Sequence, residues 1–212
     1  MMGHPALSLT KEATYKDLFD LPENVVGEII GGELFVSPRP ALPHIHASSL
    51  MGADLIGNFY GSGNGGTGSK GWWILDEPEI HLGHDILVPD LAGWKKERMP
   101  NLPDHPFFTL TPDWVCEIAS PSTSSLDRVK KSHIYAREKI PYYWIIDPVA
   151  QTLEARKLVK SQWVEIGSFE GKTKAKIEPF QAVEFDLSRW WFYPSQEKKS
   201  PTKKSFKKKK KK

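Results

Sequence analysis

The sequence predicts an α/β protein built on a mixed β-sheet with a helix packed on each face. Short β-branched or aromatic runs, which are typical of strands, alternate with two longer segments whose apolar residues follow a helical period. The run at 142–146 is nearly all apolar, as expected of a strand covered on both faces. The chain has 212 residues, a length that suits one domain with its own core.

The first third of the chain is expected to form a helix, a hairpin and a second helix. Residues 10–21 have the apolar spacing of a short helix. Two β-rich runs at 25–30 and 33–36 are separated by a glycine pair, which is a strong hairpin signal. Three prolines then break the chain before a helical pattern resumes at 46–59. The glycine-rich stretch 61–71 indicates a flexible loop, and it lacks the Gly-Lys-Ser/Thr ending of a phosphate-binding loop.

The remainder of the chain is expected to supply the sheet and the second of the two longer helices. This amphipathic helix is predicted at 125–139, bounded by Pro121 and Pro141. Two strand-like runs flank a tight Lys160-Ser161 turn and form a C-terminal β-hairpin. The predicted strands are 72–81, 86–94, 114–119, 142–146, 152–159, 162–169 and 182–185.

The charge is divided unevenly along the chain. The formal net charge is +3, but ten lysines and no acid lie in 198–212. The residues before 198 carry 19 of the 29 basic side chains against 26 acidic ones, a balance of −7. We therefore expect an ordered body at 1–196 and a disordered, lysine-rich tail at 197–212, because the tail offers almost nothing to bury. The tail is interpreted either as a salt-sensitive tether for nucleic acid or as a solvated extension without a role.

The cysteine count and the hydropathy exclude several classes of protein. Cys116 is the only cysteine, so an internal disulfide and a multi-cysteine metal site are excluded. No apolar run approaches the roughly 18–20 residues of a membrane-spanning helix. Residues 1–20 lack the continuous apolar core of a secretory signal. We therefore expect a cytoplasmic protein with no membrane contact.

Two acidic residues interrupt apolar strand sequences. Asp90 follows Pro89 within the run 86–92, and Glu117 lies within the run 114–119. An ionised carboxylate is costly to bury, so each should be paired, bound to a metal or placed at an open strand end. If the two strands are neighbours, both carboxylates could meet in an oxygen-rich pocket suited to Mg²⁺. Ordinary salt bridges at the sheet edge are the alternative.

The second of the longer helices carries a polar stripe. Asp127, Lys131, Tyr135 and Glu138 recur at helical spacing, whereas Lys130 lies about 100° away around the helix. Either the Lys131 ammonium reaches a functional site, or the stem of this lysine lies along apolar surface with its charge in solvent.

Taken in order, these motifs resemble the Uma family, a set of proposed restriction endonucleases within the PD-(D/E)XK nuclease superfamily. The matching segments are Pro89-Asp90, Glu117 to Thr123, Asp127 to Ala136 and Pro141 to Pro148. The N-terminal segment from Glu28 to Leu34, Ser37-Pro38 and His46 also fit the family pattern. The resemblance covers about residues 10–192 and rests on the ordered set, since no single motif would suffice.

The resemblance implies a restriction-endonuclease-like core that hydrolyses phosphodiester bonds of DNA with Mg²⁺ or Mn²⁺. Asp90 and Glu117 match the two acids that bind the metal, and Ile118 would add its backbone carbonyl. The superfamily lysine belongs two residues after Glu117, where this chain has Ala119. Lys131 matches the helix lysine of the Uma pattern instead, and it is the third expected catalytic residue.

Three further residues are expected near this site. Glu28 matches another acid of the family pattern, Tyr135 shares the stripe of Lys131, and His46 could contact phosphate or make a local hydrogen bond. The pair His44 and His46 could also indicate zinc, but the adjacent proline and the lack of a nearby cysteine argue against that reading.

Two functional hypotheses from different classes follow. The first is a Mg²⁺-dependent DNA endonuclease that binds DNA through its active site and its tail, acting as a homodimer to cut two strands. The second is a catalytically inactive nuclease-fold scaffold that binds nucleic acid or a protein partner, suggested by Ala119 and the acidic body. A glycosidase with paired carboxylates ranks third, because Lys131 would then have no use.

Overall fold

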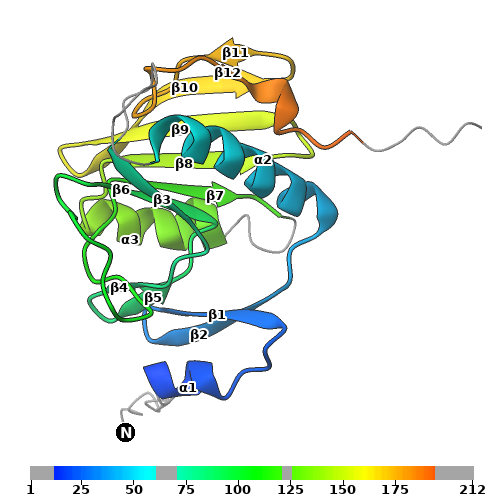
Figure 1. The fold of residues 1–212 in the computed structure, drawn as a ribbon. Helices are drawn as coiled ribbons and strands as arrows, with labels where there is room; N and C mark the ends of the chain where they lie inside the picture. The colour runs from blue at the N-terminus through cyan, green and yellow to red at the C-terminus, as the bar shows by residue number, and fades with distance from the viewer. Residues whose placement is uncertain (1–11, 61–70, 121–125, 194–212) are drawn as a thin grey trace, which may run out of the picture.

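The computed structural model describes residues 12–60, 71–120 and 126–193, without the side chains of 126–128 (Figure 1). The tail predicted at 197–212 and nearly all of the loop predicted at 61–71 lie outside these residues. Within them the chain forms the mixed α/β architecture that the sequence predicts. No helix in the described part of the chain is long and apolar enough to cross a membrane.

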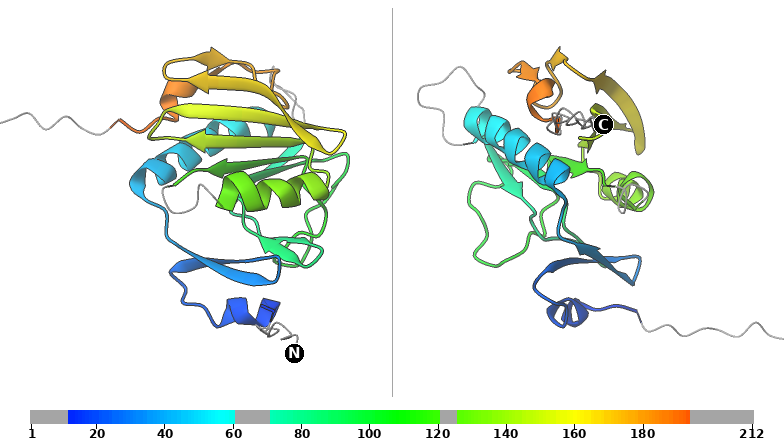
Figure 2. Two further views of the ribbon diagram at one scale, coloured as in Figure 1. Left: turned by 180° about the vertical axis from the view of Figure 1, so that it is seen from behind. Right: turned by 90° about the vertical axis from the view of Figure 1, so that its right-hand side faces the viewer.

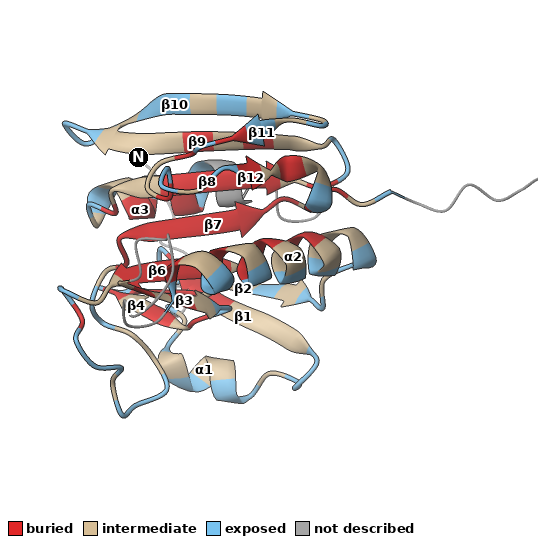
Figure 3. Cartoon of the chain, turned by 45° about the horizontal axis from the view of Figure 1, so that its top comes forward, coloured by how far each residue is buried: buried red, intermediate tan, exposed pale blue. Residues whose placement is uncertain are grey.

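The largest sheet has six strands in the order β10-β9-β8-β7-β6-β3. Its members are β3 (Trp72–Asp76), β6 (Leu91–Lys95), β7 (Trp114–Ile118), β8 (Tyr142–Asp147), β9 (Thr152–Val159) and β10 (Gln162–Glu170). β7 and β8 run parallel, whereas all other neighbours in this sheet are antiparallel. A parallel pair needs a crossover, and the helical segment between β7 and β8 provides it. β7 is buried along its whole length (Figure 3).

Two helices cover opposite faces of this sheet, as the sequence predicts (Figure 2). On one face, α2 (Leu42–Phe59) packs Met51 against Cys116, in a core cluster that also contains the last tryptophans of the chain. On the other face, α3 (Ser132–Arg137) packs in a second cluster with Val115. Because side chains alternate along a strand, neighbouring residues of β7 belong to different clusters.

Both helices differ in detail from their predicted bounds. α2 begins at Leu42 instead of residue 46, because Pro43 falls in the first turn, where no backbone N–H donor is needed. The α-helix predicted at 125–139 is a π-helix at Leu126–Lys131 that continues into α3. Single π turns inside helices are rare and occur often at functional sites. This one ends at the lysine expected in the site.

A second sheet lies beside the first and has the strand order β2-β1-β5-β4. Its members are β1 (Val25–Ile30), β2 (Glu33–Pro38), β4 (Ile80–Leu82) and β5 (Asp85–Leu87). β1 and β2 form the predicted hairpin, and its turn residues Gly31 and Gly32 have φ of 60° and 79°. That conformation favours glycine at both positions of a two-residue turn. α1 (Tyr15–Phe19), shorter than the helix predicted at 10–21, packs against β1.

Two strands that the sequence predicts as continuous are each divided between the two sheets. The predicted strand 72–81 breaks into β3 and β4 at Glu77-Pro78, where Glu77 has a φ of 45°. The predicted strand 86–94 breaks into β5 and β6 around Pro89. Proline cannot donate to a strand ladder, so it ends pairing at both positions. Asp90 consequently sits at the junction of the two sheets, immediately before β6.

The C-terminal part closes the α2 side of the large sheet. β9 and β10 form the predicted hairpin, with Lys160 and Ser161 both at positive φ. The last elements are β11 (Lys174–Ala175), β12 (Phe185–Asp186) and a 3₁₀ turn at Leu187–Arg189. The strand predicted at 182–185 is thus shorter, since it begins three residues later and ends one residue later. Trp190 and Trp191 follow it and are fully buried in the core cluster under α2.

Two glycines allow a matched test of this packing. An added Cβ at Gly93 in β6 would lie 3.1, 3.2 and 3.3 Å from the side chains of Ile74, Trp72 and Trp114. Gly57 lies on the exposed side of α2 with nothing within 4 Å. We expect Gly93→Ala to lower the free energy of unfolding in urea by about 1–3 kcal/mol. Gly57→Ala should raise it by up to about 1 kcal/mol, and a neutral Gly93→Ala would contradict the tight packing.

Candidate active site

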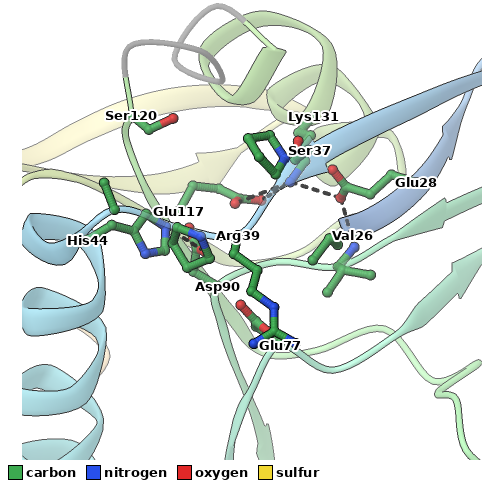
Figure 4. Close-up of a pocket in the computed structure, with 14 residues that line it drawn as sticks. Val26, Glu28, Ser37, Arg39, His44, Glu77, Asp90, Glu117, Ser120 and Lys131 are labelled. Carbon is green, nitrogen blue, oxygen red and sulfur yellow. Dashed lines mark hydrogen bonds and ion pairs between the residues drawn. The ribbon is translucent and has the colours of Figure 1, made fainter. Parts of the chain in front are cut away.

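A pocket of about 350 Å³ lies where the two sheets meet the start of α2 (Figure 4). Its charged residues are Glu28, Arg39, Glu77, Asp90, Glu117 and Lys131, and His44 lines it as well. Four carboxylates against two cations leave an excess of two negative charges when the imidazole is neutral. An excess of negative charge in a pocket favours cations over anions.

Asp90 is fixed by groups from two other elements. Its Oδ2 accepts a hydrogen bond from the backbone N–H of Ile118 at 2.6 Å, which joins the start of β6 to the end of β7. Its Oδ1 lies 2.9 Å from Nε2 of His44, in the first turn of α2. The Asp90 side chain is 17% exposed, so the carboxylate remains reachable from the pocket.

Glu117 is almost fully buried on the α3 side of β7. Its Oε1 and Oε2 lie 3.2 and 3.3 Å from Nζ of Lys131. Its Oε1 also accepts a hydrogen bond of 2.5 Å from the Tyr135 hydroxyl. Burial, followed by the charges of Glu117 and Glu28, raises the pKa of Tyr135 well above its usual value. The phenol therefore stays protonated and holds the carboxylate in place.

Lys131 lies between two buried carboxylates. Its Nζ is 2.9 Å from Oε1 of Glu28, in addition to its contact with Glu117, and none of the three side chains is more than 6% exposed. Glu28 comes from β1 and also accepts the backbone N–H of Val88 at 2.8 Å. A buried ammonium needs such close partners to offset its lost hydration. The three charges thus join the second sheet, β7 and the helical segment.

The neighbouring Lys130 points away from the pocket. Its Nζ lies 3.0 Å from Oε2 of Glu33 on the exposed surface, over the ring of Phe35. This direction agrees with the quarter-turn separation from Lys131 that the helical spacing predicts. The pair of adjacent lysines therefore offers a matched comparison between a buried and an exposed cation.

The structure brings most of the expected site residues together. Those that line the pocket are Glu28, Asp90, Glu117 and Lys131, and Ile118 contacts Asp90 through its backbone N–H. Tyr135 lies behind them, against Glu117. His46 does not line the pocket, since its ring packs edge-on against Phe192 at 6.1 Å between centroids. The side chain of Asp127 lies outside the described residues, and the catalytic roles of all these residues remain predictions.

Glu77 belongs to the pocket although no sequence pattern pointed to its function. It is held by its backbone N–H, which donates to the Asp90 carbonyl at 3.1 Å, and by a positive φ that is costly for a residue with a side chain. Burial raises the pKa of Glu77, and the charges of Asp76 and Asp90 raise it further, against the opposing effects of His44 and Arg39. The break of a strand-like run at Glu77-Pro78 is the signal that could have found it.

Arg39 and His44 are the other pocket residues that the sequence did not assign to this site. Arg39 stands between Pro38 and Pro40 in the link from β2 to α2. His44 became a partner of Asp90 because α2 starts before Pro43, earlier than its apolar pattern indicates. An arginine between two prolines is an unusual sequence feature, but only the fold shows that this arginine lies in a pocket with carboxylates.

The oxygen donors of the pocket fit Mg²⁺ by their chemistry. Mg²⁺ is bound by one or two carboxylates and keeps several waters, and Asp90 and Glu117 line one pocket. Each carboxylate oxygen can accept more than one contact, so the present hydrogen bonds leave capacity for an ion. Within the described residues, no three acidic, histidine or cysteine side chains form a ready-made metal cluster. The ion would therefore rely on water and substrate oxygens beside these two acids.

A mixed sheet with carboxylates at the ends of two adjacent strands and a buried lysine beside them defines a restriction-endonuclease-like fold. A solved structure described as "Crystal structure of a putative nuclease belonging to DUF820", from Anabaena variabilis ATCC 29413, has a similar fold, with a TM-score of 0.64. It is 21% identical and aligns over 82% of this chain and 97% of its own. Residues 14–188 match the Uma2 family, described as "Putative restriction endonuclease", and the chain belongs to that family. No curated protein matches the chain.

The buried lysine predicts a large difference between adjacent positions. Lys131→Met removes the cation between two buried carboxylates and should lower the free energy of unfolding by about 3–5 kcal/mol. Lys130→Met removes an exposed pair and should change it by less than about 1 kcal/mol. Urea denaturation at neutral pH measures both variants. Equal losses at the two positions would contradict the buried arrangement.

Proposed function

We propose that this protein is a Mg²⁺-dependent endonuclease that hydrolyses phosphodiester bonds of DNA. The observation that supports this most is the meeting of Asp90, Glu117 and Lys131 in one pocket of a nuclease-like fold. The family match and the similar solved structure agree with a nuclease. Neither of them indicates the metal or the nucleic acid, which are inferred from the chemistry of the pocket.

In this proposal two acidic side chains bind the ion, and other groups of the chain orient these two side chains. Asp90 and Glu117 are the side-chain ligands, with the Ile118 carbonyl as a backbone ligand. When bound, Mg²⁺ polarises a phosphoryl oxygen and lowers the pKa of coordinated water. His44 and the Ile118 N–H orient Asp90, and Tyr135 orients Glu117. This supporting layer holds the ligands in position before substrate arrives.

Lys131 takes the role that the superfamily gives to a strand lysine. The strand position is Ala119, whose side chain cannot carry charge. The Lys131 ammonium reaches Glu117 from the helix and is placed to offset negative charge that develops on the phosphate. Glu28 keeps that ammonium oriented from the opposite side. A fixed cation needs little rearrangement during the reaction, which is the advantage of a preorganised site.

The partners of the site are also part of the proposal. DNA would bind at the pocket and along the lysine-rich tail, a cytoplasmic setting suits the single free cysteine, and a homodimer would cut both strands. The residues before 198 have a charge of −7, so they offer little general attraction for a polyanion. Electrostatic capture by the tail would compensate for this.

A scaffold without turnover is the second candidate, and one observation favours it. Both key carboxylates are already engaged by protein groups: Asp90 by His44 and Ile118, and Glu117 by Lys131 and Tyr135. An internal cation can stabilise such a pocket without any metal. Metal-dependent cleavage separates the two candidates directly.

Isosteric replacement of either metal-binding acid tests the proposal. Asp90→Asn and Glu117→Gln keep the side-chain size but remove a negative charge each, so plasmid cleavage in Mg²⁺ should fall by on the order of 10²-fold or more. Gln162→Asn, on the exposed edge strand β10, serves as a control that should cut normally. Wild-type turnover in either acid variant would contradict the two-carboxylate site.

Removing the tail tests its proposed role in capture. A chain ending at residue 197 loses ten lysines, so its affinity for DNA should fall and the dependence of that affinity on salt should flatten. The rate of cleavage at saturating DNA should be unchanged. Fluorescence anisotropy across a salt series measures the first two quantities. Identical affinity and salt slope for the two chains would show that the tail takes no part.

A further inference from the structure

We propose that Arg39 is a phosphate-binding residue of this pocket, which contacts the DNA backbone next to the scissile bond. The assignment rests on the proposed function, because it names how that site receives an anionic strand. Arg39 is exposed and lines the pocket that contains Asp90 and Glu117. Figure 4 shows its side chain extending toward Glu77.

The pocket carries an excess of negative charge, so an anionic substrate needs an available cation to bind there. Lys131 is held by two buried carboxylates and is only 4% exposed, so it can act on a phosphate only at close range. Among the residues that the structure describes, Arg39 makes no ion pair, and it is the other cation of the pocket. A phosphate approaching four carboxylates is repelled unless a positive group compensates, and a guanidinium can bind phosphate in a bidentate manner.

The backbone fixes where Arg39 can reach. β2 ends at Pro38 and α2 begins at Leu42, so three residues span the gap between two anchored elements. The rings of Pro38 and Pro40 fix their own φ, and Pro40 also restricts the backbone of Arg39. A short, stiff link of this kind lowers the entropy lost when the guanidinium binds a ligand.

Glu77 lies with its side chain near the guanidinium at the pocket (Figure 4). Its backbone is tied to Asp90 by the 3.1 Å hydrogen bond, so the carboxylate stays beside the metal-binding acids. The positive charge of Arg39 acts on the Glu77 carboxylate, in the direction of lowering its pKa. A phosphate that enters the pocket would give the guanidinium the bidentate partner with which it can form two parallel hydrogen bonds.

Binding of a short labelled single strand tests the assignment. The full-length protein is titrated in Ca²⁺, a larger oxygen-binding cation, with the integrity of the probe checked on a gel. We expect Arg39→Ala to weaken binding by about 10- to 100-fold, and to reduce the slope of log K against log salt by about 0.7. Arg39→Lys should bind at an intermediate level, since it keeps the charge but loses the planar fork.

Lys130→Ala removes an exposed cation outside the pocket, so this variant is the matched control and should bind nearly as wild type. Equal affinity of Arg39→Ala and wild type would overturn the proposal.

Replacing single phosphates of the DNA probe by neutral groups locates the phosphate that Arg39 contacts. Probes that carry a single methylphosphonate at successive positions should each weaken wild-type binding, and at one position the loss should vanish in Arg39→Ala. Additive losses at every position would show that Arg39 binds no particular phosphate, which also overturns the assignment. If wild type binds in this pattern but does not cut DNA in Mg²⁺, the proposed nuclease function fails and Arg39 stands as part of a binding scaffold. If wild type does not bind the strand at all, both proposals fail.

Discussion

The ammonium of Lys131 between the carboxylates of Glu28 and Glu117 is the contact that the pocket is built around. The three side chains come from a hairpin strand, the central strand and the π-helical segment, and all are buried. Removing Lys131 would leave two buried carboxylates without their cation in a region of low polarity. The triad therefore fixes the second sheet against the first, and it places the side chains of the candidate site at the same time.

Under the proposed function, this arrangement compensates for the absence of a lysine at the strand position. Glu117 and Ala119 share one face of the extended strand, because alternate residues point the same way. The helical segment packs over this face, and the Lys131 side chain extends from it to Glu117. The π turn that ends at Lys131 changes the phase of the helix at that point, and α3 then presents Tyr135 to the same carboxylate. One carboxylate is thus held by two groups of one helical segment.

The sequence predicted the parts of the structure that depend on apolar patterning. Asp90 and Glu117 stood out because acids rarely interrupt buried strands, and Lys131 was separated from Lys130 by helical phase alone. The division of two predicted strands between the two sheets was missed. The run around Pro89 is apolar on both sides of the proline, and the interruption of the other run at Glu77-Pro78 was not treated as the end of a strand. The sequence therefore also failed to predict that residues on the segments between these strands would line the pocket.

Glu77, Arg39 and His44 show the limit of sequence patterns for a site of this kind. Their functions depend on segments that lie far apart along the chain and meet only in the fold. No periodicity relates them, and each taken alone resembles an ordinary surface charge or helix residue. His46, which the family pattern favoured, instead packs against an aromatic ring, because two residues along a helix is more than half a turn away from His44.

The central claim is that the helix lysine replaces the missing strand lysine, and transfer of the charge between the two positions tests it. Turnover of a plasmid in Mg²⁺ is measured for Lys131→Met and for the same variant with Ala119→Lys, at a temperature where circular dichroism shows both to be folded. The account predicts that turnover falls by on the order of 10²-fold or more in the first variant. It predicts recovery in the second, because a lysine at the strand position would reach the Glu117 carboxylate as the helix lysine does in the wild type. Wild-type turnover by Lys131→Met would contradict it.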